Sequence, residues 1–312
     1  MPKKQKIIWI VNCVSRKTTP TADDLSINTY SSDLNRRATQ WIDRISKPVS
    51  EMSTALNLYQ GEYWKVVKDT ISKNGLLDIE LWVVSAGYGL FPASAHIESY
   101  NATFSREDLN YVIKDHTFTD KLHAEHYWWS KLNEWKGPEN SPRSIASLLK
   151  KNPNYPVIIS LSRRYLSVVS NDLEEALSGV EQKNNLFLVC SGGLSYPFEP
   201  FQISTHAKYT QKLGGTRIAV NLRTAAEIIS SHSRHDFNFD KVQTMVMKKL
   251  YDLPEVKEIK RKKMSDKEII QIIESMRHKS DSHSSLLRLF REQGYACEQS
   301  RFRNLYNKSL KS

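Results

Sequence analysis

Cysteine is scarce in this sequence and follows no pattern. The three cysteines, Cys13, Cys190 and Cys297, lie far apart in the chain of 312 residues. A disulfide framework needs several pairs of cysteines, and a zinc finger needs closely spaced ones, so this distribution fits neither. We therefore expect a protein of a reducing compartment, and the cytoplasm is the expected location.

Long apolar runs are also missing. A helix that spans a bilayer needs about 20 consecutive apolar residues, and no stretch of the sequence approaches that length. The early apolar run Ile7–Val11 is too short for the core of a signal peptide. The composition therefore excludes a membrane-spanning protein.

Signatures of metal and nucleotide cofactors are absent as well. His123 and His126 are three residues apart, but no third ligand follows at a suitable spacing. The glycines match neither the Walker spacing nor the G-x-G-x-x-G spacing. We expect no metal site and no cofactor.

Acidic residues are outnumbered, and the imbalance is uneven. The chain has 45 Lys and Arg against 34 Asp and Glu, a net charge of +11. Residues 246–312 contain 16 Lys and Arg against 9 Asp and Glu, a net charge of +7. No strongly amphipathic basic helix with an aromatic face is visible, so a nucleic acid is favoured over a membrane. Double-stranded DNA is the expected partner, and a basic surface without a partner is the alternative.

Four short apolar runs predict the strands of a mostly parallel sheet. Each ends in a small or polar cluster, and helical patterns separate them, as in α/β proteins. The runs are Lys6–Val14, Ile79–Val84, Val157–Leu161 and Leu186–Cys190. Helices should flank this sheet, including most of residues 105–150. We predict an α/β domain over residues 1–245 and a small, all-helical module over residues 246–312.

The carboxyl ends of the predicted strands hold the candidate substrate-binding residues. Open α/β sheets bind ligands at this edge, where small residues let a ligand approach the backbone. Tyr88 and Tyr100 offer aromatic faces here, and an ordinary turn with packed tyrosines is the alternative. The predicted substrate-binding residues are Ser15, Ser85, Gly87, Tyr88, Tyr100, Asn101, Ser191, Gly192 and Gly193.

Two further stretches hold the candidate DNA-binding residues. The backbone N–H groups of residues 214–216 (Gly-Gly-Thr) could receive a phosphate between two arginines. In the tail, Ser265–Glu268 resembles a capping box, and Gly294 separates two short helical stretches, as in a helix-turn-helix. A three-helix cap without DNA contacts is the alternative. The predicted DNA-binding residues are Arg217, Arg223, Lys260, Arg261, Lys262, Lys263, Arg301 and Arg303.

Several short elements resemble a family of nucleobase-handling α/β proteins. Cys13–Lys17 resembles the C-x-x-x-K element that closes the first strand of that family. Ala55–Gly61 resembles its A-x-x-L-Y-x-G element. Ser85–Leu90 and then Ile97–Tyr100 resemble its S-A-x-Y-G-L and I-x-x-Y elements. Leu213–Asn221 is similar to the L-G-G-x-R…N element of the longer members.

This resemblance covers about residues 6–230 and implies a function on DNA bases. The relatives include domains of archaeosine-forming enzymes, YaaA-like DNA-binding proteins and 7-deazaguanine DNA-modification systems, with a sheet related to that of uracil-DNA glycosylases. Leu286–Phe302 resembles a DNA-binding tail of members in phage-defence settings. The resemblance implies a DNA glycosylase that removes a modified cytosine, such as glucosylated hydroxymethylcytosine, from phage DNA. A GxDPY-like water-activating loop is missing, so uracil-glycosylase roles do not transfer residue by residue.

Base excision sets chemical demands that the sequence can meet. The base must be flipped out, because its glycosidic bond is inaccessible in a stacked duplex. A carboxylate or amide must place water beside an oxocarbenium-like state, and donors must stabilise the leaving base. The candidate catalytic residues are Asn12, Asp23, Asp24, Lys17 and His206. The alternatives are a DNA-binding sensor or regulator without chemistry, and a transglycosylase that exchanges guanine for a deazaguanine.

Overall fold

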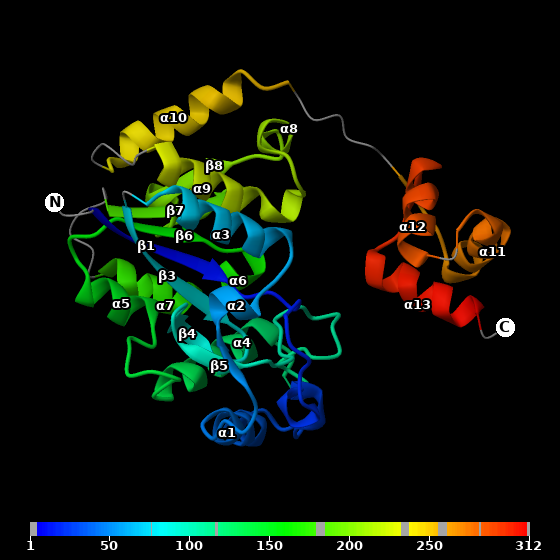
Figure 1. Cartoon of the computed structure of the whole chain (residues 1–312), viewed down its shortest axis with the longest axis horizontal. Helices are drawn as coiled ribbons and strands as arrows, with labels where there is room; N and C mark the ends of the chain where they lie inside the picture. The colour runs from blue at the N-terminus through cyan, green and yellow to red at the C-terminus, as the bar shows by residue number, and fades with distance from the viewer. Residues whose placement is uncertain are drawn as a thin grey trace. The chain divides into compact units, whose positions relative to one another are not determined.

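The computed structural model describes residues 5–75, 77–115, 118–178, 185–231, 237–254, 261–280 and 282–310. The chain divides into two compact units, Met1–Pro254 and Glu255–Ser312 (Figure 1). The predicted boundary after residue 245 falls inside helix α10 (Phe239–Tyr251), whose Val242 and Val246 are buried in the core of the first unit. Among the described residues, no helix has both the length and the apolarity needed to cross a bilayer.

The first unit is built on a six-stranded, mostly parallel sheet, so the predicted α/β class is confirmed. Its strands are β1 (Gln5–Asn12), β3 (Leu77–Ser85), β4 (Gly89–Pro92), β6 (Val157–Ser160), β7 (Leu186–Ser191) and β8 (Gln202–Thr205). They lie in the order β4-β3-β1-β6-β7-β8, and only β4 runs antiparallel to its neighbour. The four predicted strands are β1, β3, β6 and β7.

The central strands are apolar because helices cover both faces of the sheet. Figure 1 shows α3 (Glu62–Lys73), α9 (Val220–Ser231) and α10 on one side. On the other side lie α4 (Lys121–Glu134), α5 (Ile145–Lys151) and α7 (Ser170–Ser178). Trp9 of β1, Trp64 of α3 and Trp128 of α4 are fully buried between these layers.

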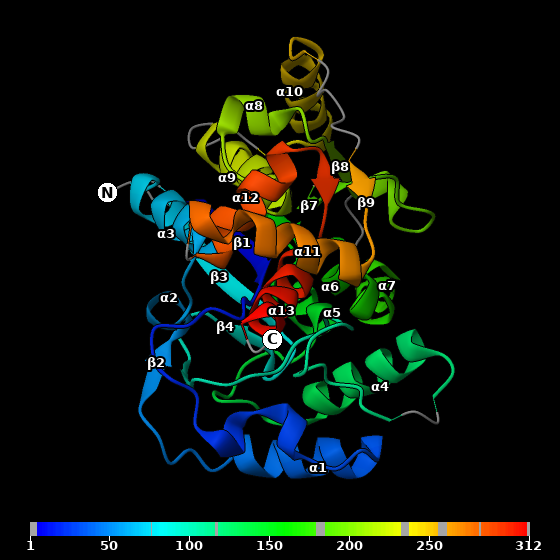
Figure 2. The same ribbon diagram turned by 90° about the vertical axis from the view of Figure 1, so that its right-hand side faces the viewer.

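The strand order reverses between β1 and β6. Counted along the chain, the parallel strands lie in the order 2-1-3-4-5, so β1 connects to one side and β6 lies on the other. In such doubly wound sheets the ligand site lies outside the carboxyl ends of the strands at this reversal. Figure 2 looks onto the sheet from the side toward which β1 points in Figure 1. We call the region outside the carboxyl ends of the strands the switch edge.

Helices α1 (Leu34–Ile45), α2 (Ala55–Leu58) and α3 lie between β1 and β3 along the chain. The prediction of helix across residues 105–150 is wrong at the described residues before Lys121, and again at residues 135–144 between α4 and α5. The Asp120 carboxylate accepts the backbone N–H groups of Leu122 and His123 and begins α4 there. Before it, Thr103 pairs with Tyr111 in a folded-back loop.

The second unit contains helices α11 (Asp266–Met276), α12 (His283–Glu292) and α13 (Gln299–Ser309). Two short strands, β9 (Lys262–Lys263) and β10 (Tyr295–Ala296), pair in parallel, so the prediction of an all-helical module is wrong in this respect. The predicted capping box is present: the hydroxyl of Ser265 accepts the Glu268 N–H, and the Glu268 carboxylate accepts the Ser265 N–H. Ile269, Phe290 and Phe302 bury against one another as a separate core.

Candidate functional site

Asn12 ends β1 at the switch edge and ties it to β6. Its Oδ1 accepts hydrogen bonds from the Tyr63 hydroxyl at 3.1 Å and from the Ser162 N–H at 3.1 Å. Its Nδ2 donates to the Cys13 carbonyl at 2.9 Å. Both atoms of the amide are therefore engaged within the protein, and only 7% of the residue is exposed. This predicted catalytic residue holds the edge together.

Lys17 lies against a group of buried hydroxyls, which we call the lysine–tyrosine cluster: Lys17, Tyr59, Ser85 and Tyr100. The Tyr100 hydroxyl is 2.7 Å from that of Tyr59 and 2.6 Å from Ser85 Oγ. The Lys17 Nζ lies 4.2 Å from the centre of the Tyr100 ring and 5.8 Å from that of Tyr59. Two predicted substrate-binding residues and one predicted catalytic residue thus come together.

The cluster has a cation but no anion among its members. Burial lowers the pKa of the Lys17 amine to about 8, against a smaller raising effect of Cys13. Burial also holds the pKa of the Tyr59 and Tyr100 hydroxyls well above the ordinary value, so both phenols stay neutral at physiological pH. A half-buried amine beside neutral hydroxyls can act as a nucleophile or as a proton donor.

Gly87 and Tyr88 belong to the wall of the cluster. A Cβ at Gly87 would lie 2.5 Å from two ring atoms of Tyr100, so the residue must be glycine. Tyr88 is 2% exposed, and its ring packs against those of Phe91, Tyr100 and Trp135. For Tyr88, the packed-tyrosine alternative describes the structure.

The two candidate aspartates lie in a 3-10 turn after β1. Asp24 forms an ion pair with Arg44, whose guanidinium also binds the buried Glu98 carboxylate at 2.9 Å. Asp23 is exposed in the same turn. Asn101 is bound to this segment, because its side chain donates to Ser26 Oγ at 3.0 Å. The segment is therefore anchored, and both aspartates are exposed on it, with Asp24 held by Arg44.

The ends of β7 and β8 form a second, more exposed part of the edge. Ser191, Gly192 and Gly193 are exposed, and the Gly193 carbonyl accepts a hydrogen bond from Arg163 at 2.9 Å. His206 is exposed after β8. β8 is three strands from β1, so the ends of these two strands are separated by roughly 14 Å across the sheet. The structure does not bring these residues to the lysine–tyrosine cluster, and Ser15 is exposed beside Lys17.

The glycine loop predicted to receive a phosphate holds a carboxylate of the protein itself. Glu62 Oε1 accepts the Thr216 N–H at 2.9 Å and the Arg223 guanidinium at 2.9 Å. A Cβ at Gly215 would lie 2.2 Å from the same oxygen. Arg223 is thus committed to an internal ion pair, whereas Arg217 is exposed.

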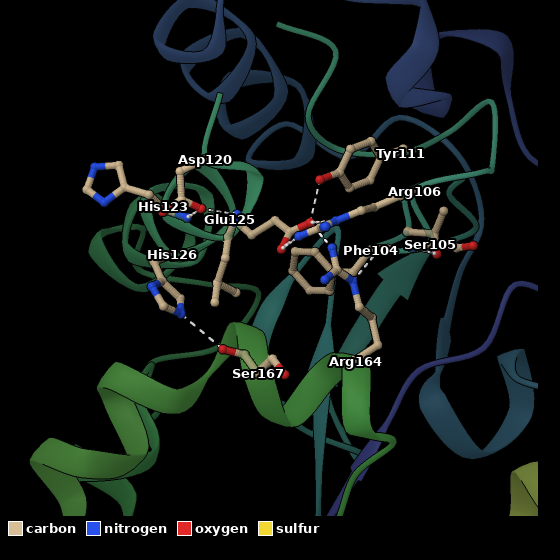
Figure 3. A network of polar contacts seen from close by, with 12 residues as sticks. Phe104, Ser105, Arg106, Tyr111, Asp120, His123, Glu125, His126, Arg164 and Ser167 are labelled. Atoms are coloured by element: carbon tan, nitrogen blue, oxygen red, sulfur yellow. Dashed lines mark hydrogen bonds and ion pairs between the residues drawn. The ribbon is translucent and has the colours of Figure 1, made fainter. Parts of the chain in front are cut away.

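A second charged cluster lies beside the switch edge and was not predicted. Glu125 of α4 is fully buried and binds the guanidiniums of Arg106 and Arg164 and the Tyr111 hydroxyl (Figure 3). Arg164 also donates to the Phe104 carbonyl at 2.9 Å. We call Glu125, Arg106, Arg164 and Tyr111 the Glu125 cluster, which joins α4 to α6 (Arg163–Val168) and to the folded-back loop.

In the second unit some of the predicted DNA-binding side chains form hydrogen bonds within the protein, and others are exposed. Arg301 donates to Asp266 Oδ1 at 2.8 and 2.6 Å, and Arg261 donates to the Arg291 carbonyl at 3.2 Å. Arg303 is exposed on α13. The side chains of Lys262 and Lys263 are exposed on β9, and Lys260 lies outside the described residues.

Comparison of the chain with family models, with curated proteins and with solved structures found no match. Within the described ranges, no group of three or more His, Cys, Asp and Glu side chains could hold a metal ion. His126 instead contacts the Ser167 carbonyl at 3.0 Å (Figure 3), and His123 is exposed.

Proposed function

We propose that this chain is a DNA glycosylase of antiphage defence that flips and excises a modified cytosine, with glucosylated hydroxymethylcytosine as the substrate class. The observation that carries the proposal is the lysine–tyrosine cluster at the switch edge. Three elements of the family resemblance, Cys13–Lys17, Ala55–Gly61 and Ser85–Leu90, contribute Lys17, Tyr59 and Ser85 to this one cluster. That convergence also supports kinship of the sheet with that of uracil-DNA glycosylases.

The roles in this proposal follow the chemistry that each side chain has available. Lys17 contacts the sugar or the leaving base. Its amine is available for this because it has no internal carboxylate partner in the described part of the chain. Asp23 and Asp24 are both exposed in the loop after β1, but Asp24 is paired with Arg44, so Asp23 is our candidate for placing water. Asn12 and Tyr88 support the site from within.

The second unit supplies the proposed grip on the duplex. One side of α13 exposes Gln299, Arg303, Asn304 and Asn307, while Phe302 is buried on the other. Amide and guanidinium groups are those that hydrogen-bond base edges in the major groove and phosphates beside it. This side of α13 supports a helix-turn-helix-like contact.

A DNA-binding sensor or regulator without chemistry is the second candidate. The engagement of both amide atoms of Asn12 favours it, because the amide at the strand end is then unavailable to place water. Such a protein would bind DNA with the same salt dependence and release no product.

Incubation of the purified full chain with glucosylated and with unmodified phage DNA tests the proposal. We expect alkali-labile abasic sites in the glucosylated DNA alone, and release of the modified base, detected by mass spectrometry. Salt-sensitive binding without either product would establish the sensor instead. Incorporation of labelled 7-deazaguanine into the DNA would establish the transglycosylase.

The DNA grip has a test of its own, with a matched pair of arginines on α13. Arg303→Ala should weaken binding and reduce the slope of log affinity against log salt by about one unit, as expected for one lost phosphate contact. Arg301→Ala should change this slope less, since its guanidinium is bound to Asp266. Equal effects of the two substitutions would contradict the proposed use of α13.

A further inference from the structure

Lys17 is bonded unlike Lys6 and Lys249, two other partly buried lysines of the first unit. Its Nζ donates to the Val14 and Ser15 carbonyls at 3.4 and 3.3 Å, and no carboxylate contacts it in the described part of the chain. Lys6 and Lys249, in contrast, each form an ion pair with a glutamate. Burial without a compensating anion favours the neutral, nucleophilic form of an amine.

The surroundings of Lys17 suit a cationic adduct as well as a free amine. The faces of the Tyr100 and Tyr59 rings attract a cation through their quadrupoles. An iminium formed on Nζ carries the same positive charge as the ammonium and would lie against the same ring faces. The site would therefore stabilise a Schiff base of Lys17.

The loop that carries Lys17 is held in place at the switch edge. The Thr18 N–H donates to the Leu58 carbonyl at 2.8 Å, and the Gln60 N–H donates to the Arg16 carbonyl at 3.0 Å. Ser15 and Arg16 are exposed beside the amine, so a nucleic-acid backbone can approach from that side. A fixed amine at a ligand edge costs little reorganisation when it reacts.

We propose that Lys17 is a nucleophile toward the C1′ aldehyde of abasic DNA, which gives the chain a β-lyase activity after base loss. The inference rests on the proposed action on DNA but is independent of which base is excised. The lowered pKa, about 8, supports it, because a substantial fraction of the amine is then neutral near physiological pH.

The proposed reaction needs no oxidant or cofactor. The Nζ lone pair attacks C1′ of the ring-opened sugar. The aldehyde oxygen takes one proton from the amine and one from solvent and leaves as water, which forms a protonated imine. C2′ then gives a proton to solvent, its electrons form the C2′–C3′ double bond, and the 3′ phosphate leaves with the C3′–O electrons. Water finally hydrolyses the imine and returns the amine.

Borohydride trapping of the full chain on a duplex with one abasic site tests the inference. Reduction of the imine should join protein and DNA covalently, and strand cleavage should occur without borohydride. Lys17→Arg keeps the charge and cannot form the imine, so trapping should fall to background. Lys68→Arg is the matched control and should trap like the wild type, since Lys68 also donates to a carbonyl near the cluster, that of Tyr59 at 3.1 Å.

Peptide mapping of the wild-type adduct by mass spectrometry makes the test independent of how the variants fold. Attachment at Lys17 supports the inference. Attachment at another residue, trapping by a folded Lys17→Arg protein, or no wild-type trapping would overturn it. Base release from glucosylated DNA is measured separately. Trapping without release would contradict the glycosylase alone, and release without trapping would contradict the lyase alone.

Discussion

Glu125 and Lys17, two charged residues of the first unit, differ in whether groups of opposite charge lie beside them. The Glu125 carboxylate is fully buried and is neutralised by two guanidiniums, with a phenol as a further donor. The Lys17 ammonium is half-buried against ring faces, neutral hydroxyls and backbone carbonyls. When one partner of a buried ion pair is removed, the remaining charges stay buried without a counter-ion, and the folded state is destabilised. A buried charge that has no counter-ion already destabilises the folded state, so its removal is stabilising. The two clusters should therefore respond to charge removal with opposite signs.

The largest effect should come from the Glu125 cluster. Glu125→Gln keeps the side-chain volume but leaves Arg106 and Arg164 without their anion, so the free energy of unfolding should fall by about 3 kcal/mol. Urea denaturation at pH 7 measures this loss. Glu134→Gln is the control, because its pair with Lys131 is exposed and should contribute less than about 0.5 kcal/mol. Similar small losses in both variants would show that the Glu125 cluster is not an anchor.

Removing the Lys17 charge should have the opposite sign. Lys17→Met keeps the apolar stem and should raise the free energy of unfolding at pH 7 by about 2 kcal/mol. Each unit of the pKa shift corresponds to about 1.4 kcal/mol, and the attraction of the ammonium to the tyrosine ring faces offsets part of this cost.

The pH dependence of this difference follows from the sign of the shift. The pKa of Lys17 is about 8 in the folded chain, against 10.5 for an ordinary lysine. Between these values the folded state binds fewer protons than the unfolded state, so wild-type stability should rise with pH and the gap should close. Urea titrations at pH 7, 9 and 10.5 check this, with exposed Lys65→Met as the control of constant gap. A gap for Lys17→Met that stays constant would mean that the folded amine is fully compensated.

Gly87→Ala separates packing from charge in the lysine–tyrosine cluster. The added methyl group would lie 2.5 Å from the Tyr100 ring and 3.3 Å from that of Trp41, so the free energy of unfolding should fall by about 1–3 kcal/mol. Gly75→Ala should be nearly neutral in the same thermal or urea assay, because no atom lies within 4 Å of its added methyl. Equal stability of the two variants would mean that Tyr100 moves freely.

The smallest effect should come from Glu62, a compensated carboxylate that is 35% exposed. Burial raises its pKa, but Arg223 and the Thr216 N–H outweigh this, and the net pKa is lowered. The contribution is therefore fully present above the ordinary pKa and is lost as pH falls through the lowered pKa of the folded state. Glu62→Gln should cost less than about 1 kcal/mol at pH 7, and this cost should shrink as the pH of the urea denaturation is lowered below the ordinary pKa. A cost that does not shrink with falling pH would point to a role independent of charge.

Most of the sheet could be predicted because β1, β3, β6 and β7 are apolar runs with polar ends. The strands that were missed have weak local signals. β4 begins at Gly89, which has a positive φ and looks like part of a turn. β8 has four residues, Gln202–Thr205, of which only Ile203 is aliphatic. Both are edge strands, whose pairing depends on neighbours that local sequence does not reveal.

The candidate site could be predicted only where sequence position and chemistry coincide. Ser85 ends β3 and Lys17 lies in the loop after β1, so their place at the edge was predictable. The burial of Tyr88 was not, because Arg143 and Trp135, which contact it, come from distant segments. The arginine partners of Glu125 are likewise 19 and 39 residues away, and the two nearby histidines gave the stronger local signal.

The position of β1 in the sheet has a consequence for synthesis. The Trp9 indole donates to Ser160 Oγ at 2.9 Å across 151 positions, and β1 pairs with both β3 and β6. Chains emerge from the ribosome N-terminus first, so the apolar run Ile7–Val11 must wait for its second neighbour until Val157–Ser160 has been made. Pairings between such distant segments also form slowly. β1 therefore remains half-paired, and exposed to misassembly, until β6 arrives.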